Sequence, residues 1–115
     1  MKFAVLVAII ADDLEEKAID IAKKAGAGGV TMLDARGIGA KEKKTFFGLT
    51  YEGSQSVLIC VLEKKLSLRV MKALTAELEL ARHSKGVVFT VPLDHIAGID
   101  TRQLESFEAR IKDDI

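Results

Sequence analysis

The sequence predicts one α+β domain in which four strands and two helices alternate in the order βαββαβ. Four runs are dominated by aliphatic and β-branched residues, and they lie at 3–10, 30–36, 56–62 and 86–91. The segments after the first and third runs carry apolar residues at helical spacing. The chain has 115 residues, which is the size of a single domain with a single core.

The first half of this pattern begins at 3–10, where the nearly continuous apolar run is typical of a central strand. Asp12 and Asp13 follow, each with a glutamate three residues later, which is a capping-box pattern at a helix start. Apolar residues then recur at helical spacing, and Gly26 ends the helix. Residues 30–36 are the second predicted strand.

An irregular stretch with four glycines, residues 37–55, separates the second strand from the third at 56–62. The second helix is predicted over 66 to about 82, because apolar residues recur four apart. Its start is weakly marked, with Ser67 as a candidate cap.

The last strand, 86–91, ends before Pro92, since proline cannot donate to a sheet ladder. A second capping pattern at 100–103 precedes a short terminal helix with an apolar stripe. We expect a ferredoxin-like domain over 1–98, and a C-terminal helix and tail over 99–115.

Both helices should cover one face of an antiparallel sheet, which leaves an apolar second face that another surface must cover. A homo-oligomer is the simplest way to cover it.

Charge and cysteine content exclude several function classes. Seventeen basic residues balance 17 acidic ones, so no positive field favours nucleic acid. Cys60 is the only cysteine, so an intrachain disulfide is impossible and a reducing compartment is expected. The apolar start resembles a signal peptide but lacks a cleavage pattern and is too short to span a membrane, so we expect a soluble cytoplasmic protein.

The segment Gly29-Val-Thr-Met-Leu-Asp-Ala-Arg-Gly-Ile-Gly39 resembles the strand that leads into the T-loop of the PII signalling proteins. The order of the predicted elements also resembles that family over about residues 1–98. The resemblance implies a homotrimer whose sheets face the threefold axis, with adenine nucleotides or related small effectors bound in clefts between subunits. It also implies that a T-loop, here about 37–55, reports the bound effector to a target.

The resemblance implies a set of ligand-binding residues: Thr31, Arg36, Gly37, Ile38, Gly39, Val61, Lys85 and Gly86. Glycines let backbone amides approach phosphate closely, and an arginine can contact phosphate or carboxylate through two hydrogen bonds. Glycines at a strand end also serve simply to bend the chain.

The chain departs from the family where PII proteins hold the phosphates. The stretch Ala81-Arg-His-Ser-Lys-Gly86 is shorter than the family's glycine-rich loop and holds one glycine. The acidic position of the third strand is Ile59, and the C-terminal arginine pair is missing. We therefore expect AMP, ADP, a cyclic nucleotide or bicarbonate as the effector in preference to ATP with magnesium.

The long loop carries residues suited to docking on a target protein or membrane transporter: Lys41, Lys44, Phe46, Phe47 and Tyr51. Alternatively, the two phenylalanines extend the flanking hairpin and pack on a neighbouring subunit.

A second hypothesis is a metal-binding or assembly trimer similar to the divalent-cation tolerance proteins. It requires a ligand cluster at the subunit junction, and the sequence offers only His83, His95 and Cys60 beside its carboxylates. An enzyme is not expected, because the turn after the first strand is acidic and no catalytic pattern is apparent. No metal or cofactor is predicted.

Overall fold

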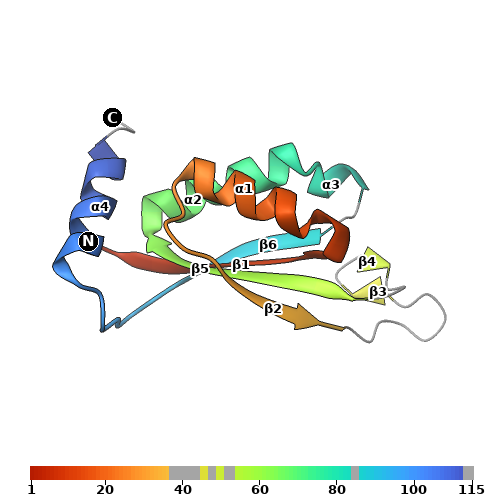
Figure 1. Ribbon diagram of the computed structural model, residues 1–115, viewed down its shortest axis with the longest axis horizontal. Coiled ribbons are helices and arrows are strands. Elements are labelled where there is room, and N and C mark those ends of the chain that lie inside the picture. Colours follow the sequence, from red (N-terminus) through yellow and green to blue (C-terminus); the bar gives the residue numbers. More distant parts are fainter. Residues whose placement is uncertain (37–44, 47–48, 51–53, 84–85, 113–115) are drawn as a thin grey trace.

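The computed structural model describes residues 1–36, 45–46, 49–50, 54–83 and 86–112 (Figure 1). Its strands are β1 (Phe3–Ala11), β2 (Thr31–Ala35), β3 (Thr45–Phe46), β4 (Leu49–Thr50), β5 (Gln55–Glu63) and β6 (Gly86–Pro92). Its helices are the 3₁₀ turn η1 (Asp12–Leu14), α1 (Glu15–Ala25), α2 (Lys64–Glu77), α3 (Leu80–His83) and α4 (Thr101–Lys112). Among the described residues, each helix is too short or too polar to cross a membrane.

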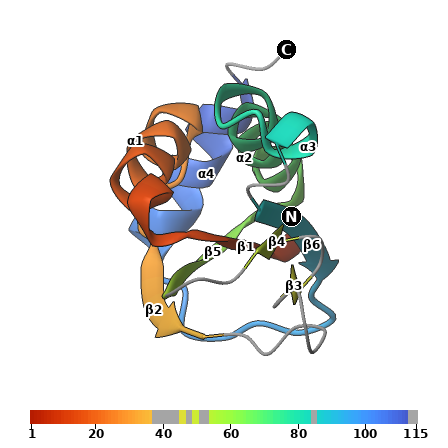
Figure 2. The ribbon, with the colours of Figure 1, turned by 90° about the vertical axis from the view of Figure 1, so that its right-hand side faces the viewer.

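The main sheet has the strand order β2-β5-β1-β6, and every neighbouring pair is antiparallel. Helices α1 and α2 lie side by side over one face of it, as the end-on view shows (Figure 2). The predicted α+β ferredoxin-like fold is therefore confirmed. β6 runs one residue further than predicted, through Pro92, which pairs with Ala4. β6 is an edge strand of the sheet, where proline is tolerated.

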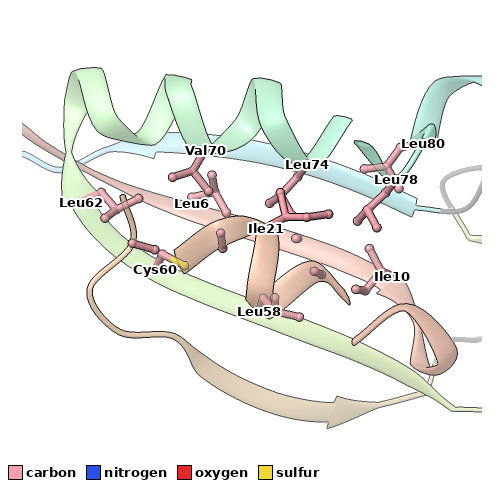
Figure 3. Packing of buried hydrophobic residues seen from close by; sticks show 14 of the residues in the cluster. Leu6, Ile10, Ile21, Leu58, Cys60, Leu62, Val70, Leu74, Leu78 and Leu80 are labelled. Atoms are coloured by element: carbon pink, nitrogen blue, oxygen red, sulfur yellow. The ribbon is translucent and has the colours of Figure 1, made fainter. Parts of the chain in front are cut away.

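The core fills the space between the sheet and these helices (Figure 3). Alternate residues of the two central strands point into it, among them Leu6, Leu58 and Cys60, and each is at most 1% exposed. Leu74 and Val70 pack on them from α2 and are fully buried. Apolar residues at helical spacing in α2 and alternate apolar residues of the strands therefore form one core layer.

The prediction of a capping box at the start of the first helix is wrong. No side-chain oxygen caps η1 or α1. The buried Ser56 hydroxyl, which has one proton to donate, instead lies within hydrogen-bonding distance of the carboxylates of both Asp12 and Glu15, with Ser56 Oγ 2.7 Å from Asp12 Oδ1. A partner more than forty positions away in the chain has replaced the local one.

Helix α2 starts earlier than predicted, and Ser67 is not its cap. The Glu63 carboxylate accepts from the backbone N–H groups of Lys65 (2.8 Å) and Leu66 (3.2 Å). The Ser67 hydroxyl donates to the Lys64 carbonyl instead. A glutamate is not among the preferred N-cap residues, so this role was hard to predict from residue type.

The helix predicted over 66–82 is divided into α2 and α3. Glu79 has a φ of 52°, in the left-handed region that interrupts a helix. The turn places Leu78 and Leu80, on either side of Glu79, in the core, where each is 3% exposed. Burial of two leucines therefore compensates for the unfavourable backbone conformation.

Within the long stretch between the second and third predicted strands, β3 and β4 pair with each other as a separate two-stranded sheet. β5 begins at Gln55, one residue before the expected start. The remainder of 37–53 lies outside the described residues.

The predicted terminal helix is present as α4, which lies at one end of the molecule beside the N-terminus (Figure 1). Its capping box is reciprocal: Gln103 N donates to Asp100 Oδ1 (2.9 Å), and Asp100 N donates to Gln103 Oε1 (3.0 Å). The Phe107 ring packs edge-on against Phe3, with ring centroids 5.6 Å apart. The sequence therefore predicted the helix correctly, while its docking position depends on tertiary contacts.

Candidate ligand-binding site

The sheet face opposite α1 and α2 is apolar, and among the described helices only α4 adjoins it, at one end. Register and alternation place one set of side chains on this open face: Val5, Val7, Ile9, Leu33, Val57, Ile59, Val61, Val87, Phe89 and Val91. Leu33 is 50% exposed, Val61 45% and Phe89 38%. A continuous apolar surface on all four strands is typical of a binding or assembly surface.

A pocket of about 370 Å³ lies where this face meets α4. Its volume falls in the range of small-molecule sites. The strand side of the pocket consists of Thr31 on β2 with Ile59 and Val61 on β5. The preceding loop and α4 complete the lining with Gly28, Gly29, Gln103, Ser106, Phe107 and Arg110.

The pocket combines an apolar floor with hydrogen-bonding groups. Ile59, Val61 and Phe107 supply the apolar part, whereas the Thr31 hydroxyl and the Arg110 guanidinium supply donors. Arginine is the only charged residue type in the lining, so the pocket favours electron-rich or anionic ligand groups. The arrangement can bind a small molecule, and none of the lining residues forms a nucleophile–base pair.

Two residues predicted for the ligand site, Thr31 and Val61, line this pocket together. Arg36 is exposed and lies at the other end of β2, five residues or about 16 Å from Thr31 at strand spacing. Gly86 lies at that same far end, because it pairs with Ile10 in β1. Within one subunit, the predicted set is therefore divided between the two ends of the sheet.

Gly86 also has a packing role that is independent of any ligand. A Cβ at this position would come within 2.7 Å of the Ile9 carbonyl oxygen and of Ile10 Cγ2. Only glycine therefore lets β6 approach β1 here.

Most of the remaining predicted residues lie outside the described residues: Gly37, Ile38, Gly39, Lys41, Lys44, Phe47, Tyr51 and Lys85. Phe46 belongs to β3, where it pairs with Leu49.

The sequence reasoning missed the α4 side of the pocket and the two glycines that precede β2. The spacing of the terminal helix was visible in the sequence, but nothing local shows where such a helix docks. It also missed a carboxylate cluster beside Ser56, in which one oxygen from each of Asp12, Glu15 and Asp34 lies within 4.8 Å of the others. Acidic groups often cluster without a metal, so this cluster by itself assigns no metal.

Cys60 is not part of the site. It is 1% exposed on the helix-facing side of β5, and burial raises the pKa of its thiol to about 11. The predicted role of a buried apolar residue is confirmed, because a thiol with a raised pKa is a poor nucleophile at neutral pH.

The family model of the nitrogen regulatory protein P-II matches residues 3–103 of the chain. A search of curated proteins found no match. Several solved structures share the fold. CPII from Thiomonas intermedia K12, solved with ADP and bicarbonate, is 21% identical with a TM-score of 0.61, covering 81% of this chain and 87% of that chain.

A candidate PII-like signalling protein from Thermus thermophilus is 20% identical with a TM-score of 0.62, covering 81% of this chain and 87% of that chain. The periplasmic divalent cation tolerance protein CutA from Archaeoglobus fulgidus is 12% identical with a TM-score of 0.62, covering 96% of this chain and 99% of that chain. At these identities the likeness establishes the fold and not the ligand.

Proposed function

The chain belongs to the nitrogen regulatory protein P-II family, and from that premise we propose that it is a trimeric sensor. Its effector is an adenine nucleotide, AMP or ADP in preference to ATP, or a small anion such as bicarbonate. The effector binds in clefts between subunits. The segment 37–55 acts as the T-loop and carries the signal to a target protein or membrane transporter.

The observation that carries this proposal is the pocket on the open face of the sheet. Thr31 and Val61, which the family resemblance assigns to the ligand cleft, line one pocket of about 370 Å³. The CPII structure with ADP and bicarbonate supports the same ligand classes for a protein of this fold. The shortened stretch before β6 favours a nucleotide with few phosphates.

The proposed trimer follows from the open face and from the two sheet edges. The open face is built from valine, isoleucine, leucine and phenylalanine side chains. Covering it with other copies of the chain removes these side chains from water, which stabilises the assembly. Arg36 and Gly86 lie at one end of the sheet but on opposite edges. In a closed ring with head-to-tail contacts, one edge of a subunit meets the opposite edge of the next. We expect such a ring to bring Arg36 of one chain towards Gly86 of its neighbour.

Calorimetry with AMP, ADP, ATP and bicarbonate tests the sensor directly, alongside light scattering for the oligomeric state. An effector present at a hundred times its Kd should stabilise the protein by about 2.7 kcal/mol. Thr31→Val keeps the shape of the side chain and removes the hydroxyl, so the Kd for AMP should rise about fivefold, or ~1 kcal/mol. Thr75→Val on the exposed surface of α2 is the matched control and should leave the Kd unchanged.

The alternative is an assembly trimer without an effector, like the divalent-cation tolerance proteins in architecture. It predicts a stable trimer whose unfolding midpoint does not move with any nucleotide or bicarbonate at millimolar concentration. A monomer at micromolar concentration would contradict both candidates.

A further inference from the structure

One side of the pocket is built by a single face of α4. Its four α4 residues are Gln103, Ser106, Phe107 and Arg110. They are spaced i, i+3, i+4 and i+7, so they form one stripe along the helix. Three of the four are polar, whereas the strand side of the pocket has two apolar residues of its three.

Contacts with several other elements hold α4 in this position. Phe107 packs on the Phe3 ring of β1, and Arg110 donates from Nη1 to the Gly26 carbonyl. Arg69 of α2 donates to the Arg110 carbonyl at 3.2 Å. The α4 side of the pocket is therefore fixed to β1, to α2 and to the loop after α1.

The pocket chemistry fits a flat heterocycle better than an anion alone. A bicarbonate ion would leave most of a 370 Å³ pocket empty, and it would not use the apolar surfaces of Ile59 and Val61. A purine has apolar faces and ring nitrogens that accept hydrogen bonds. An arginine has five N–H donors, and Arg110 has one nitrogen engaged with Gly26, so donors remain. A guanidinium also stacks well on aromatic rings.

We propose that α4 forms the base-binding wall of the effector site, with Ser106 and Arg110 contacting the adenine ring opposite Ile59 and Val61. This inference rests on the proposed function and extends it to residues beyond the strand and loop segments.

The decisive variant fills the pocket from the α4 side. Ser106→Tyr places a ring in the cavity, whereas Glu105→Tyr adds the same ring at an exposed neighbouring position outside the lining. We expect Ser106→Tyr to raise the Kd at least tenfold for both AMP and adenosine, and Glu105→Tyr to change it less than twofold. Far-UV circular dichroism checks that both variants fold. Ser106→Leu replaces Ser106→Tyr if the larger ring prevents folding.

Adenosine lacks the phosphate of AMP. A change in its Kd therefore reports on contacts other than those to the phosphate. Equal losses for AMP and adenosine support a base-binding wall. A loss for AMP alone would overturn the assignment, since the pocket would then hold the phosphate. If Ser106→Tyr binds AMP as tightly as the unmodified protein, α4 is not part of the site, although the sensor proposal still stands. If the unmodified protein binds no adenine nucleotide, the sensor proposal fails and this inference fails with it.

Discussion

The two faces of the main sheet are built from similar residue types but differ in solvent exposure. On the helix side, Leu6, Leu58 and Cys60 are at most 1% exposed. On the open side, Leu33 and Val61 are 50% and 45% exposed. Valine, leucine and isoleucine alternate between the two faces along the same strands, so side-chain chemistry does not distinguish them.

What distinguishes the faces is the element that covers each of them. Two amphipathic helices, α1 and α2, lie over one face. The folded monomer therefore depends on the helix side, and the open side is available for assembly and for the pocket. Mutations on the two sides should accordingly affect different properties.

The largest expected effect is on assembly, when a charge is placed on the open face. Phe89 pairs with Val7 and points to that side, so Phe89→Glu would place one carboxylate per subunit in the proposed trimer interface. Burying unpaired charges costs several kcal/mol each. Light scattering should then give the mass of one 12.5 kDa chain, with an unchanged far-UV spectrum.

Leu68→Glu is the matched control for this experiment. Leu68 is 40% exposed, close to the exposure of Phe89, but it belongs to α2 in the helix layer on the other side of the sheet. It should leave the trimer intact. Equal behaviour of the two variants would show that the open face is not the assembly surface.

The next effect in size is on folding itself. Leu58→Ala removes a fully buried side chain from the core and should lower the free energy of unfolding by about 2–5 kcal/mol in urea titrations. Val61→Ala, three residues along the same strand but on the open face, should cost less than about 1 kcal/mol. Measuring both in the Phe89→Glu background removes any contribution from assembly. Similar losses for the two variants would contradict the division between the faces.

The smallest expected effect is a pH dependence of the unfolding free energy that comes from the Cys60 thiol. Burial raises the pKa of its thiol to about 11, above the ordinary value of 9.0. The folded state therefore holds the proton more tightly than the unfolded state. The resulting stabilisation is complete below about pH 9 and decreases as the pH rises towards 11. The difference in unfolding free energy between the unmodified protein and Cys60→Ala should shrink over that interval, and a constant difference would contradict it.

The sequence predicted most of the fold because the information is local and periodic. The four strands, both main helices and α4 follow from apolar runs and helical spacing. The errors lie where a distant contact overrides a local rule. The carboxylates of Asp12 and Glu15 contact Ser56 and do not cap the helix as predicted. The second helix is interrupted at Glu79, next to the buried Leu80.

The candidate site was less predictable for the same reason. Thr31 and Val61 could be assigned from the family pattern, and they do share a pocket. The α4 side of this pocket depends on the contacts of Arg110 with Gly26 and of Phe107 with Phe3, which join positions more than eighty residues apart. No periodicity within α4 encodes those contacts.

The position of β1 has a consequence for synthesis on the ribosome. β1 is a central strand and is made first, yet its partner β5 ends at Glu63, 52 residues after Ala11. At a synthesis rate of about 5–20 residues per second, roughly 3–10 s pass before β5 is complete and β1 can pair with it. The four acidic residues among positions 12–16 emerge directly behind it, and such charges hinder aggregation of an exposed apolar strand. We therefore expect the acidic turn to limit aggregation of the nascent chain until its sheet can close.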